Sequence, residues 1–218
     1  MKNSAKITPQ ALVHIIDDDE AVRDAIAMLL DTVNIDNRSY ASAQLFLDHI
    51  SIVDPHSLMG CIVLDIRMPG ISGMDCQIKL SELGCPLPII FITGHGDVPM
   101  AVDAMKKGAL EFIQKPFREQ ELLDCIQRAL HINAQQQTRH QRSDDTKARI
   151  ATLTPRELEV MDKVIAGQAN KVIAIDLNLS QRTVEIHRAN VMEKMQARSL
   201  AELVRMIIRL GAGEDRPA

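Results

Sequence analysis

The fold of this chain is decided by the stretch Cys61-Ile62-Val63-Leu64-Asp65-Ile66-Arg67-Met68-Pro69-Gly70. Four apolar residues lead into one aspartate, and a Met-Pro-Gly turn follows. A continuous apolar run that ends in turn residues predicts a strand buried on both faces of a parallel sheet. Asp65 then lies at the carboxyl end of that strand, where open α/β sheets place their active crevice. The alternative is an aspartate that only caps the following turn, a common position for this residue.

Apolar strands and amphipathic helices alternate through the first 130 residues. The predicted strands cover residues 12–16, 37–40, 61–64, 88–92 and 111–114. Apolar residues at helical spacing predict helices near residues 21–33, 42–47, 73–81, 98–107 and 118–130. This alternation predicts an α/β fold with a doubly wound, five-stranded parallel sheet.

Polar side chains follow the last apolar residue of four of these strands. Asp17 and Asp18 come after the first strand, and Asp65, Thr93 and Lys115 come at the ends of later strands. Because the carboxyl ends of parallel strands share one edge of the sheet, we expect these groups to form one cluster. Three carboxylates together need a compensating cation, and Mg²⁺ takes oxygen ligands. With Lys115, such an ion would also neutralise an incoming phosphoryl group.

Composition and charge are those of an ordinary globular protein with two differently charged parts. The chain has 218 residues, of which 46% are hydrophobic and 25% charged. The net charge is −7 over residues 1–130 and +3 over residues 131–218, which indicates two domains with different partners. Residues 131–218 contain no aromatic residue, which argues against recognition of splayed bases in single strands or RNA loops.

The sequence shows no sign of secretion or membrane insertion. No apolar run approaches the ~18 residues of a membrane span, and residues 1–6 lack the apolar core of a secretory signal. The four cysteines show no CxxC spacing, so a metal site built on cysteine is not expected. We therefore expect a cytoplasmic protein that does not contact a membrane.

Residues 11–130 resemble the receiver domain of two-component response regulators. The likeness rests on Asp17-Asp18, Asp65-Ile66-Arg67-Met68-Pro69, Thr93-Gly94 and Lys115-Pro116-Phe117, which agree with that family in order and position. The resemblance implies that Asp65 is the phosphoacceptor. It also implies that Asp17 or Asp18 holds Mg²⁺ (or Mn²⁺) together with Asp65 and the backbone carbonyl of Arg67.

The same resemblance implies a phosphoryl-binding switch. In that family the positions of Thr93 and Lys115 contact the phosphoryl oxygens, the Lys115-Pro116 bond is cis, and Phe112 falls at the aromatic switch position. Phe112 lacks a hydroxyl, so any switching there must work through packing of its ring. The run Asp17-Asp18-Asp19 leaves the register of the acidic pair open, although Arg23, six residues after Asp17, favours Asp17 and Asp18.

Residues 131–149 are predicted to link two domains. They are polar and show no apolar periodicity. They contain no Gly or Pro, so we expect the preceding helix to extend into them, giving a partly helical linker.

Residues 150–212 predict a small all-α domain of four helices. Thr154 and Glu157 form a capping box for the first helix, which ends at Gly167. Asn170 is predicted to cap the second helix and Ser180 the third, which runs from residue 181 to about 195. A box of Ser199 and Glu202 is predicted to start the fourth helix, which stops at Gly211. Two short helices joined by residues 178–180 are typical of a helix-turn-helix.

The third of these helices is predicted to have two faces. Val184, Val191 and Met195 share one face, whereas the residues predicted to lie largely opposite are Gln181, Arg182, Glu185, Arg188, Ala189 and Met192. A solvated face is the alternative to a DNA-reading face.

The whole domain resembles the LuxR/NarL-type output domain. The matching residues are Leu153-Thr154-Pro155-Arg156-Glu157, Gly167, Asn170-Lys171, Ile173-Ala174, Leu177, Ser180-Gln181-Arg182-Thr183-Val184-Glu185 and His187-Arg188. Within that group, the run Met192-Glu193-Lys194-Met195 is most similar to the FixJ subfamily.

That resemblance implies that the third helix enters the DNA major groove, while Lys171 and the helix N-terminus at Ser180 meet phosphate. The residues expected at the DNA are Asn170, Lys171, Ser180, Gln181, Arg182, Thr183, Glu185, His187, Arg188 and Lys194.

Together these features predict a DNA-binding response regulator of a two-component system. We expect a sensor histidine kinase to phosphorylate Asp65, the protein to form a homodimer on double-stranded promoter DNA, and RNA polymerase to be a candidate partner. We expect no enzymatic activity beyond phosphotransfer to Asp65 and autodephosphorylation. A Mg²⁺-dependent phosphohydrolase with Asp65 as nucleophile is a weak alternative, because the position for its general acid, two residues later, is Arg67. An interaction adaptor without a DNA role is a third interpretation, which the helix-turn-helix argues against.

Overall fold

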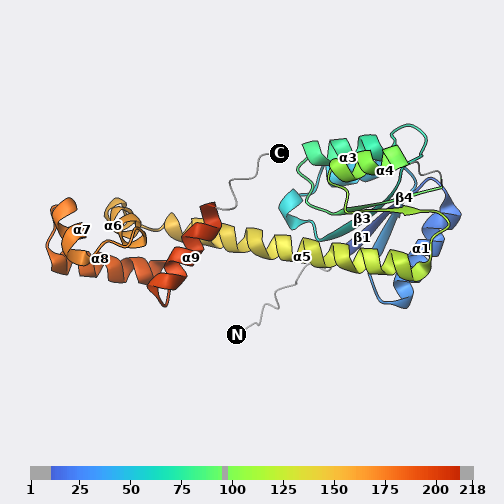
Figure 1. Cartoon of the computed structure of the whole chain (residues 1–218). Helices are drawn as coiled ribbons and strands as arrows, with labels where there is room; N and C mark the ends of the chain where they lie inside the picture. The colour runs from blue at the N-terminus through green and yellow to red at the C-terminus, as the bar shows by residue number, and fades with distance from the viewer. Residues whose placement is uncertain (1–10, 95–97, 212–218) are drawn as a thin grey trace. The chain divides into compact units, whose positions relative to one another are not determined.

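The computed structural model describes residues 11–94 and 98–211 of the chain (Figure 1). Residues 1–6, His95 and Gly96 after the fourth strand, and residue 212 at the predicted end of the second domain lie outside the described residues. The chain divides into two compact units, residues 1–137 and residues 138–218.

The first unit contains a five-stranded parallel sheet in the order β2-β1-β3-β4-β5. Its strands are β1 (Leu12–Ile16), β2 (Asn37–Tyr40), β3 (Gly60–Asp65), β4 (Ile89–Thr93) and β5 (Glu111–Gln114). All four neighbouring pairs of strands are parallel. The predicted α/β fold class is therefore confirmed, and every strand carries its carboxyl end to the same edge.

Helices cover both faces of this sheet (Figure 1). One layer contains α2 (Ala43–Ile50), α3 (Gly73–Glu82) and α4 (Val98–Lys106), and the other contains α1 (Glu20–Thr32) and α5 (Glu119–Ile150). A single-turn helix, η1 (Pro55–Ser57), precedes β3. The side chains of β3 alternate between the layers, with Ile62 and Leu64 in one core and Cys61 and Val63 in the other. Both faces of β3 are buried, which explains its unbroken apolar run.

Helix α5 continues through the residues of the predicted linker and still contacts the first unit beyond residue 130. The Asn133 amide oxygen accepts a hydrogen bond from the Gly60 backbone N–H at 2.9 Å, and its amide nitrogen donates to the Pro86 carbonyl at 3.3 Å. Gly60 has φ +141°, and a Cβ there would lie 1.8 Å from the Leu12 carbonyl oxygen, so only glycine fits. Asn133 thus satisfies the N–H of a backbone position that no other residue type can occupy.

The second unit packs four helices around one apolar core. These are α6 (Pro155–Ile165), α7 (Asn170–Asp176), α8 (Gln181–Lys194) and α9 (Leu200–Gly211). The predicted capping box is present at α6, because the Glu157 N–H donates to Thr154 Oγ1 and Glu157 Oε2 accepts from the Thr154 N–H. Ser180 caps α8 as predicted, accepting from the Thr183 N–H at 3.0 Å.

One predicted cap in this unit is wrong, and one predicted capping box is only half present. Asn170 is the first residue of α7 and does not cap it; the N-cap is Ala169, which offers no side-chain hydrogen bond. At α9 Ser199 Oγ accepts from the Glu202 N–H, but the Glu202 carboxylate accepts from the Arg198 N–H, so the reciprocal half of the predicted box falls one residue earlier. In both places spacing alone set the predicted position one residue too late.

Glu157 is a buried carboxylate that connects the first turn of α6 to the last turn of α8. Lys194, in the last turn of α8, donates from Nζ to Glu157 Oε2 at 2.6 Å and to the Thr152 carbonyl at 3.2 Å. The hydrogen bond from Lys194 and the backbone bond from Thr154 lower the pKa of the Glu157 carboxyl from 4.5 to about 2. The folded unit therefore favours the ionised carboxylate.

This pair predicts a pH dependence of stability. Because the pKa of Glu157 is depressed by folding, its contribution is complete above pH 4.5 and is lost as the pH falls toward 2. We expect Glu157→Gln to lower the unfolding temperature at pH 7 and to weaken the loss of stability on acidification. Glu159→Gln, which removes the exposed partner of Arg156 on the same helix, is the matched control and should change little. Thermal unfolding followed by circular dichroism tests this; equal effects of the two variants at pH 7 would contradict it.

Candidate functional site

The polar residues predicted to cluster at the carboxyl edge of the sheet do lie together there. Asp65 ends β3, Thr93 ends β4, and Asp17 directly follows β1. These three side chains are buried, whereas Asp18 is exposed. Lys115 follows β5 and reaches the same place with its amine. The site is therefore assembled by the strand order of the sheet.

The Lys115 amine is the centre of this cluster. Its Nζ atom lies 2.6 Å from Asp17 Oδ2 and 3.1 Å from Asp65 Oδ1, so one cation bonds two buried carboxylates. The second oxygen of Asp65 accepts from the Arg67 backbone N–H at 3.0 Å. The Lys115-Pro116 peptide is cis, as the family resemblance implied.

Burial and charge act in opposite directions on these groups. Burial raises the pKa of the Asp65 carboxyl above its ordinary value and the charge of Asp17 adds to this, whereas Lys115 and the Arg67 N–H oppose it. Burial alone would lower the pKa of Lys115, but its hydrogen bonds and charge interactions with Asp17 and Asp65 more than reverse this, so the pKa is raised. The amine therefore stays positively charged at neutral pH, which the two carboxylates require.

The structure distinguishes the three consecutive aspartates from one another. Asp17 points into the site and also accepts from the Asp19 N–H at 3.0 Å. Asp19 instead caps α1, accepting from the Ala21 N–H at 2.9 Å. Arg23 donates to the backbone carbonyl of Asp17 at 2.8 Å and so holds this turn in place. The side chain free to join Asp17 at the site is Asp18.

Three carboxylates could share one metal ion here. Oxygen atoms of Asp17, Asp18 and Asp65 all lie within 4.8 Å of one another. An all-oxygen donor set of this kind suits the hard cations Mg²⁺ and Mn²⁺, and it offers no sulfur or imidazole ligand for a softer metal. The residues present therefore fit a magnesium ion.

Thr93 and Phe112 lie on β4 and β5, the paired strands that follow β3 in the sheet. Thr93 is fully buried, and its backbone carbonyl accepts from the Lys115 N–H at 2.8 Å. Phe112 on β5 lies beside Phe91 in the sheet and packs partly buried against the same core as α4. A shift of the Thr93 backbone would therefore move Lys115 as well, because the two residues are joined by this hydrogen bond.

The second unit exposes the first turns of α8. Gln181, Arg182 and Glu185 are exposed, and Thr183 is half-buried. In the described residues, Nδ1 of His187 is buried without a hydrogen-bond partner, so only part of that half-buried side chain is available outside. Further exposed residues near this end are Ser180, the cap of α8, and Lys171 on α7.

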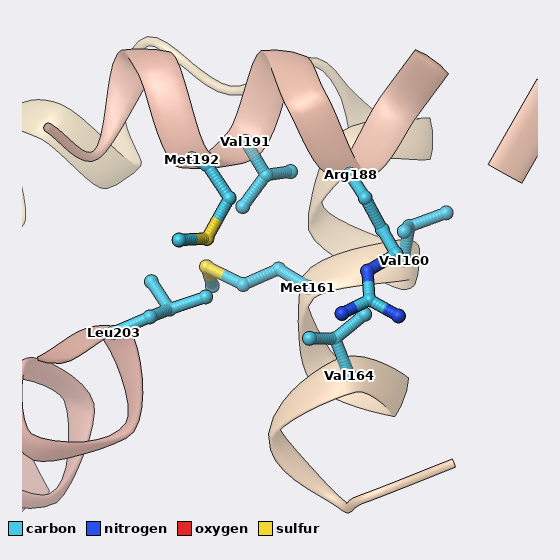
Figure 2. Close-up of a pocket in the computed structure, with 7 residues that line it drawn as sticks. All are labelled: Val160, Met161, Val164, Arg188, Val191, Met192 and Leu203. Atoms are coloured by element: carbon cyan, nitrogen blue, oxygen red, sulfur yellow. The ribbon is translucent and has the colours of Figure 1, made fainter. Parts of the chain in front are cut away.

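The prediction that Arg188 and Met192 lie opposite the apolar face of α8 is wrong. Figure 2 shows Arg188 directed toward Val160 and Val164 of α6, and Met192 directed toward Met161 and Leu203; all of these line one small space. The reason is geometric: residue 188 follows Val184 by four positions and precedes Val191 by three, which places it on the buried stripe. An arginine can occupy such a core-facing position, because its long aliphatic stem packs against apolar residues while its guanidinium bonds a polar partner.

Lys194 is not brought together with the exposed residues of α8. It lies about 20 Å along the helix from Ser180, and its amine bonds Glu157 and Thr152. Arg149, at the end of α5, likewise donates to the Met195 carbonyl at 3.1 Å. The local sequence does not predict the partners of Lys194 and Arg149. It shows only that each is a basic residue near the C-terminus of a helix, a favourable position for a positive charge.

Comparison with known proteins decides the family. Residues 13–127 match the response regulator receiver domain, and residues 151–207 match the bacterial regulatory proteins of the luxR family. The chain belongs to the response regulators with a LuxR-type output domain. Its first unit is the receiver domain, and its second unit contains the DNA-binding output domain.

The likeness extends over nearly the whole of this response regulator. The transcriptional regulatory protein FixJ of Bradyrhizobium diazoefficiens is 43% identical over 209 residues, covering 96% of this chain and 100% of FixJ. The response regulator protein TodT of Pseudomonas putida is 43% identical over 92% of this chain and 86% of TodT. The solved structure of the response regulator StyR matches with a TM-score of 0.82 and 41% identity, over 92% of this chain and 99% of that chain.

The predicted family and function are thereby confirmed. A receiver domain implies a histidine kinase as partner, and a LuxR-type domain implies binding to DNA. The chain is a transcriptional response regulator, which disfavours the phosphohydrolase alternative; Arg67 is exposed at the position where that alternative needs an acid. None of the described helices is both long and apolar enough to cross a membrane.

The acidic run allows a sharp test of the metal site. We expect Asp17→Asn and Asp18→Asn each to weaken Mg²⁺ binding by about tenfold or more, which corresponds to roughly 1.4 kcal/mol. Asp19→Asn is the matched control, because asparagine caps a helix as well as aspartate does and Asp19 does not face the site. Isothermal titration with MgCl₂ measures all three, and equal losses in the three variants would show that the register is wrong.

Proposed function

We propose that Asp65 is the phosphoacceptor of this response regulator and that a sensor histidine kinase supplies the phosphoryl group. In the transfer, the N–P bond of the kinase phosphohistidine breaks, its electron pair stays on the histidine nitrogen, and an O–P bond to Asp65 forms. The observation that carries the proposal is the Lys115 amine bonded to both Asp17 and Asp65. This amine lies where the negative charges of the two carboxylates meet, and it can also compensate the charge of a phosphoryl group on Asp65.

The neighbouring residues have distinct proposed roles. Asp17, Asp18, Asp65 and the carbonyl of Arg67 would hold Mg²⁺ or Mn²⁺, which when bound neutralises the oxygens of the transferring group. Lys115 keeps its charge and can turn from Asp65 to a phosphoryl oxygen on the same residue. The hydroxyl of Thr93, the last residue of β4, would bond a second phosphoryl oxygen. Autodephosphorylation of Asp65 would be the only other reaction of the site.

In the output domain we propose that α8 enters the major groove of double-stranded promoter DNA. The residues proposed to face the duplex are those exposed on its first turns, Gln181, Arg182 and Glu185, with Thr183 and His187 beside them. Lys171 and the N-terminus of α8 at Ser180 would contact phosphate. This placement is supported by the exposed cations Lys171 and Arg182 at the same end of the helix-turn-helix.

We further propose that phosphorylation causes dimerisation through α4, β5 and α5. Phosphoryl oxygens on Asp65 would draw Thr93 toward them and open space for the ring of Phe112. On α4, Val102 and Met105 are 45% and 44% exposed and lie next to Lys106 and Lys107. Met100, on the same helix, packs partly buried against the core. A shift from a mostly inactive to a mostly active population needs a few kcal/mol, which a bound phosphoryl group can supply.

The dimer would bring two output domains to one pseudo-symmetric site and so raise the apparent affinity through effective concentration. We assign phosphoacceptance to residues 11–130 and DNA binding to residues 150–212, with residues 131–149 as a helical connection between them. Because promoter DNA and RNA polymerase are reached in the bacterial cytoplasm, we place the protein there, with polymerase as a further partner.

The test is phosphorylation with acetyl phosphate and Mg²⁺. We expect the wild type to gain one phosphoryl group by intact mass and to sediment as a dimer, and we expect beryllofluoride, a phosphoryl mimic, to produce the same dimer. Asp65→Asn should do neither. Asp36→Asn, an exposed aspartate at the opposite edge of the sheet, should behave as the wild type.

The two parts of the proposal can fail separately. An Asp65→Asn variant that is phosphorylated at the wild-type rate would refute the assignment of the phosphoacceptor. A phosphorylated wild type that stays monomeric, with unchanged DNA affinity, would refute dimerisation and favour relief of a contact within one chain.

A further inference from the structure

Arg188 occupies an unusual place for an arginine on a DNA-reading helix. Its side chain leaves α8 toward α6 and passes close to Val160 and Val164 (Figure 2). The space that remains beside it is about 10 Å³, at most enough for one water molecule. The arginine stem therefore fills a core position, and turning it outward would leave a void under α8.

The guanidinium of Arg188 has a defined partner on the other helix of the motif. It donates from Nη1 to the side-chain oxygen of Asn170, the first residue of α7. Asn170 is free for this bond because it does not cap α7; the N-cap is Ala169. A hydrogen bond from a charged donor is stronger than a neutral one and fixes direction through the planar guanidinium.

We propose that Arg188 is a positioning residue for DNA recognition. Together with Asn170 it sets the orientation of α7 against α8 and does not itself touch DNA. Lys171 directly follows Asn170, and Arg182 lies on the exposed side of α8. The Arg188–Asn170 bond would therefore fix the positions of these two exposed cations relative to each other. This inference rests on the proposed DNA-binding face and removes Arg188 and Asn170 from the predicted contacts.

A positioning residue and a phosphate contact have different signatures. Removal of a phosphate contact weakens binding to every sequence and lowers the slope of log K against log salt by roughly one unit. Loss of the correct helix orientation instead weakens binding to the recognised sequence and leaves the general electrostatic attraction in place. The ratio of specific to non-specific affinity therefore separates the two roles, and a change in folding stability alone does not move it.

The experiment uses the full-length protein activated with beryllofluoride. The probes are a duplex enriched from a random library by the wild-type protein and an unselected duplex of the same length, each titrated over a range of salt concentrations. We expect Arg188→Ala to lower affinity for the enriched duplex by about tenfold, equal to roughly 1.4 kcal/mol, with the salt slope and non-specific affinity unchanged. Lys171→Ala, which removes the proposed phosphate contact next to Asn170, is the control and should lower the slope by roughly one.

Asn170→Ala provides a second variant that removes no core volume. We expect it to reproduce the loss of specificity of Arg188→Ala, and we expect the double variant to lose little more than either single variant, because the two residues act as one pair. Thermal unfolding of each variant confirms that it is folded at the assay temperature.

Several results would overturn the inference. A slope lowered by roughly one in Arg188→Ala would make this residue a phosphate contact, and unchanged affinity would deny it any role. If the affinity losses of Arg188→Ala and Asn170→Ala add up in the double variant, the two residues do not act as one pair. If instead Lys171→Ala leaves the salt slope unchanged on both duplexes, the proposed DNA-binding face itself is wrong, whatever the result for Arg188→Ala.

Discussion

The site of the receiver domain depends on one interaction. The Lys115 amine donates one hydrogen bond to Asp17 and a second to Asp65. Two buried carboxylates side by side repel each other, and the positive charge of the Lys115 amine compensates both. The parallel sheet supplies that cation by bringing the ends of β1, β3 and β5 to one edge. The order of the strands is therefore what turns three residues far apart in sequence into one site.

This constraint explains which parts of the site could be predicted from the sequence. Asp65, Thr93 and Lys115 are predictable because each ends or directly follows a strand, and parallel strands end together. The register of the acidic run is not, because three consecutive aspartates look alike until the backbone assigns one of them to cap α1. The contact of Asn133 with Gly60 joins residues 73 positions apart and leaves no periodic trace in the sequence.

In the output domain the helices were predictable from capping and apolar spacing, while the role of single polar residues was not. Arg188 is predicted on the face opposite the apolar residues and among the DNA contacts, although its distances of four from Val184 and three from Val191 place it on the buried stripe. Asn170 was assigned as a cap because of its residue type, and the structure gives that place to Ala169. Where residue type and periodicity disagree on a helix, periodicity decides the face.

The account is tested most directly by the ionisation of Asp65 itself. Burial and Asp17 raise its pKa while Lys115 lowers it, so removal of the amine by Lys115→Met should raise that pKa further. Carbon-13 NMR of labelled aspartate carboxyls, assigned with Asp65→Asn, follows this titration in the wild type and in Lys115→Met. We predict a higher pKa for Asp65 in Lys115→Met than in the wild type. An equal or lower pKa would show that the Lys115 amine does not balance the charge of the site.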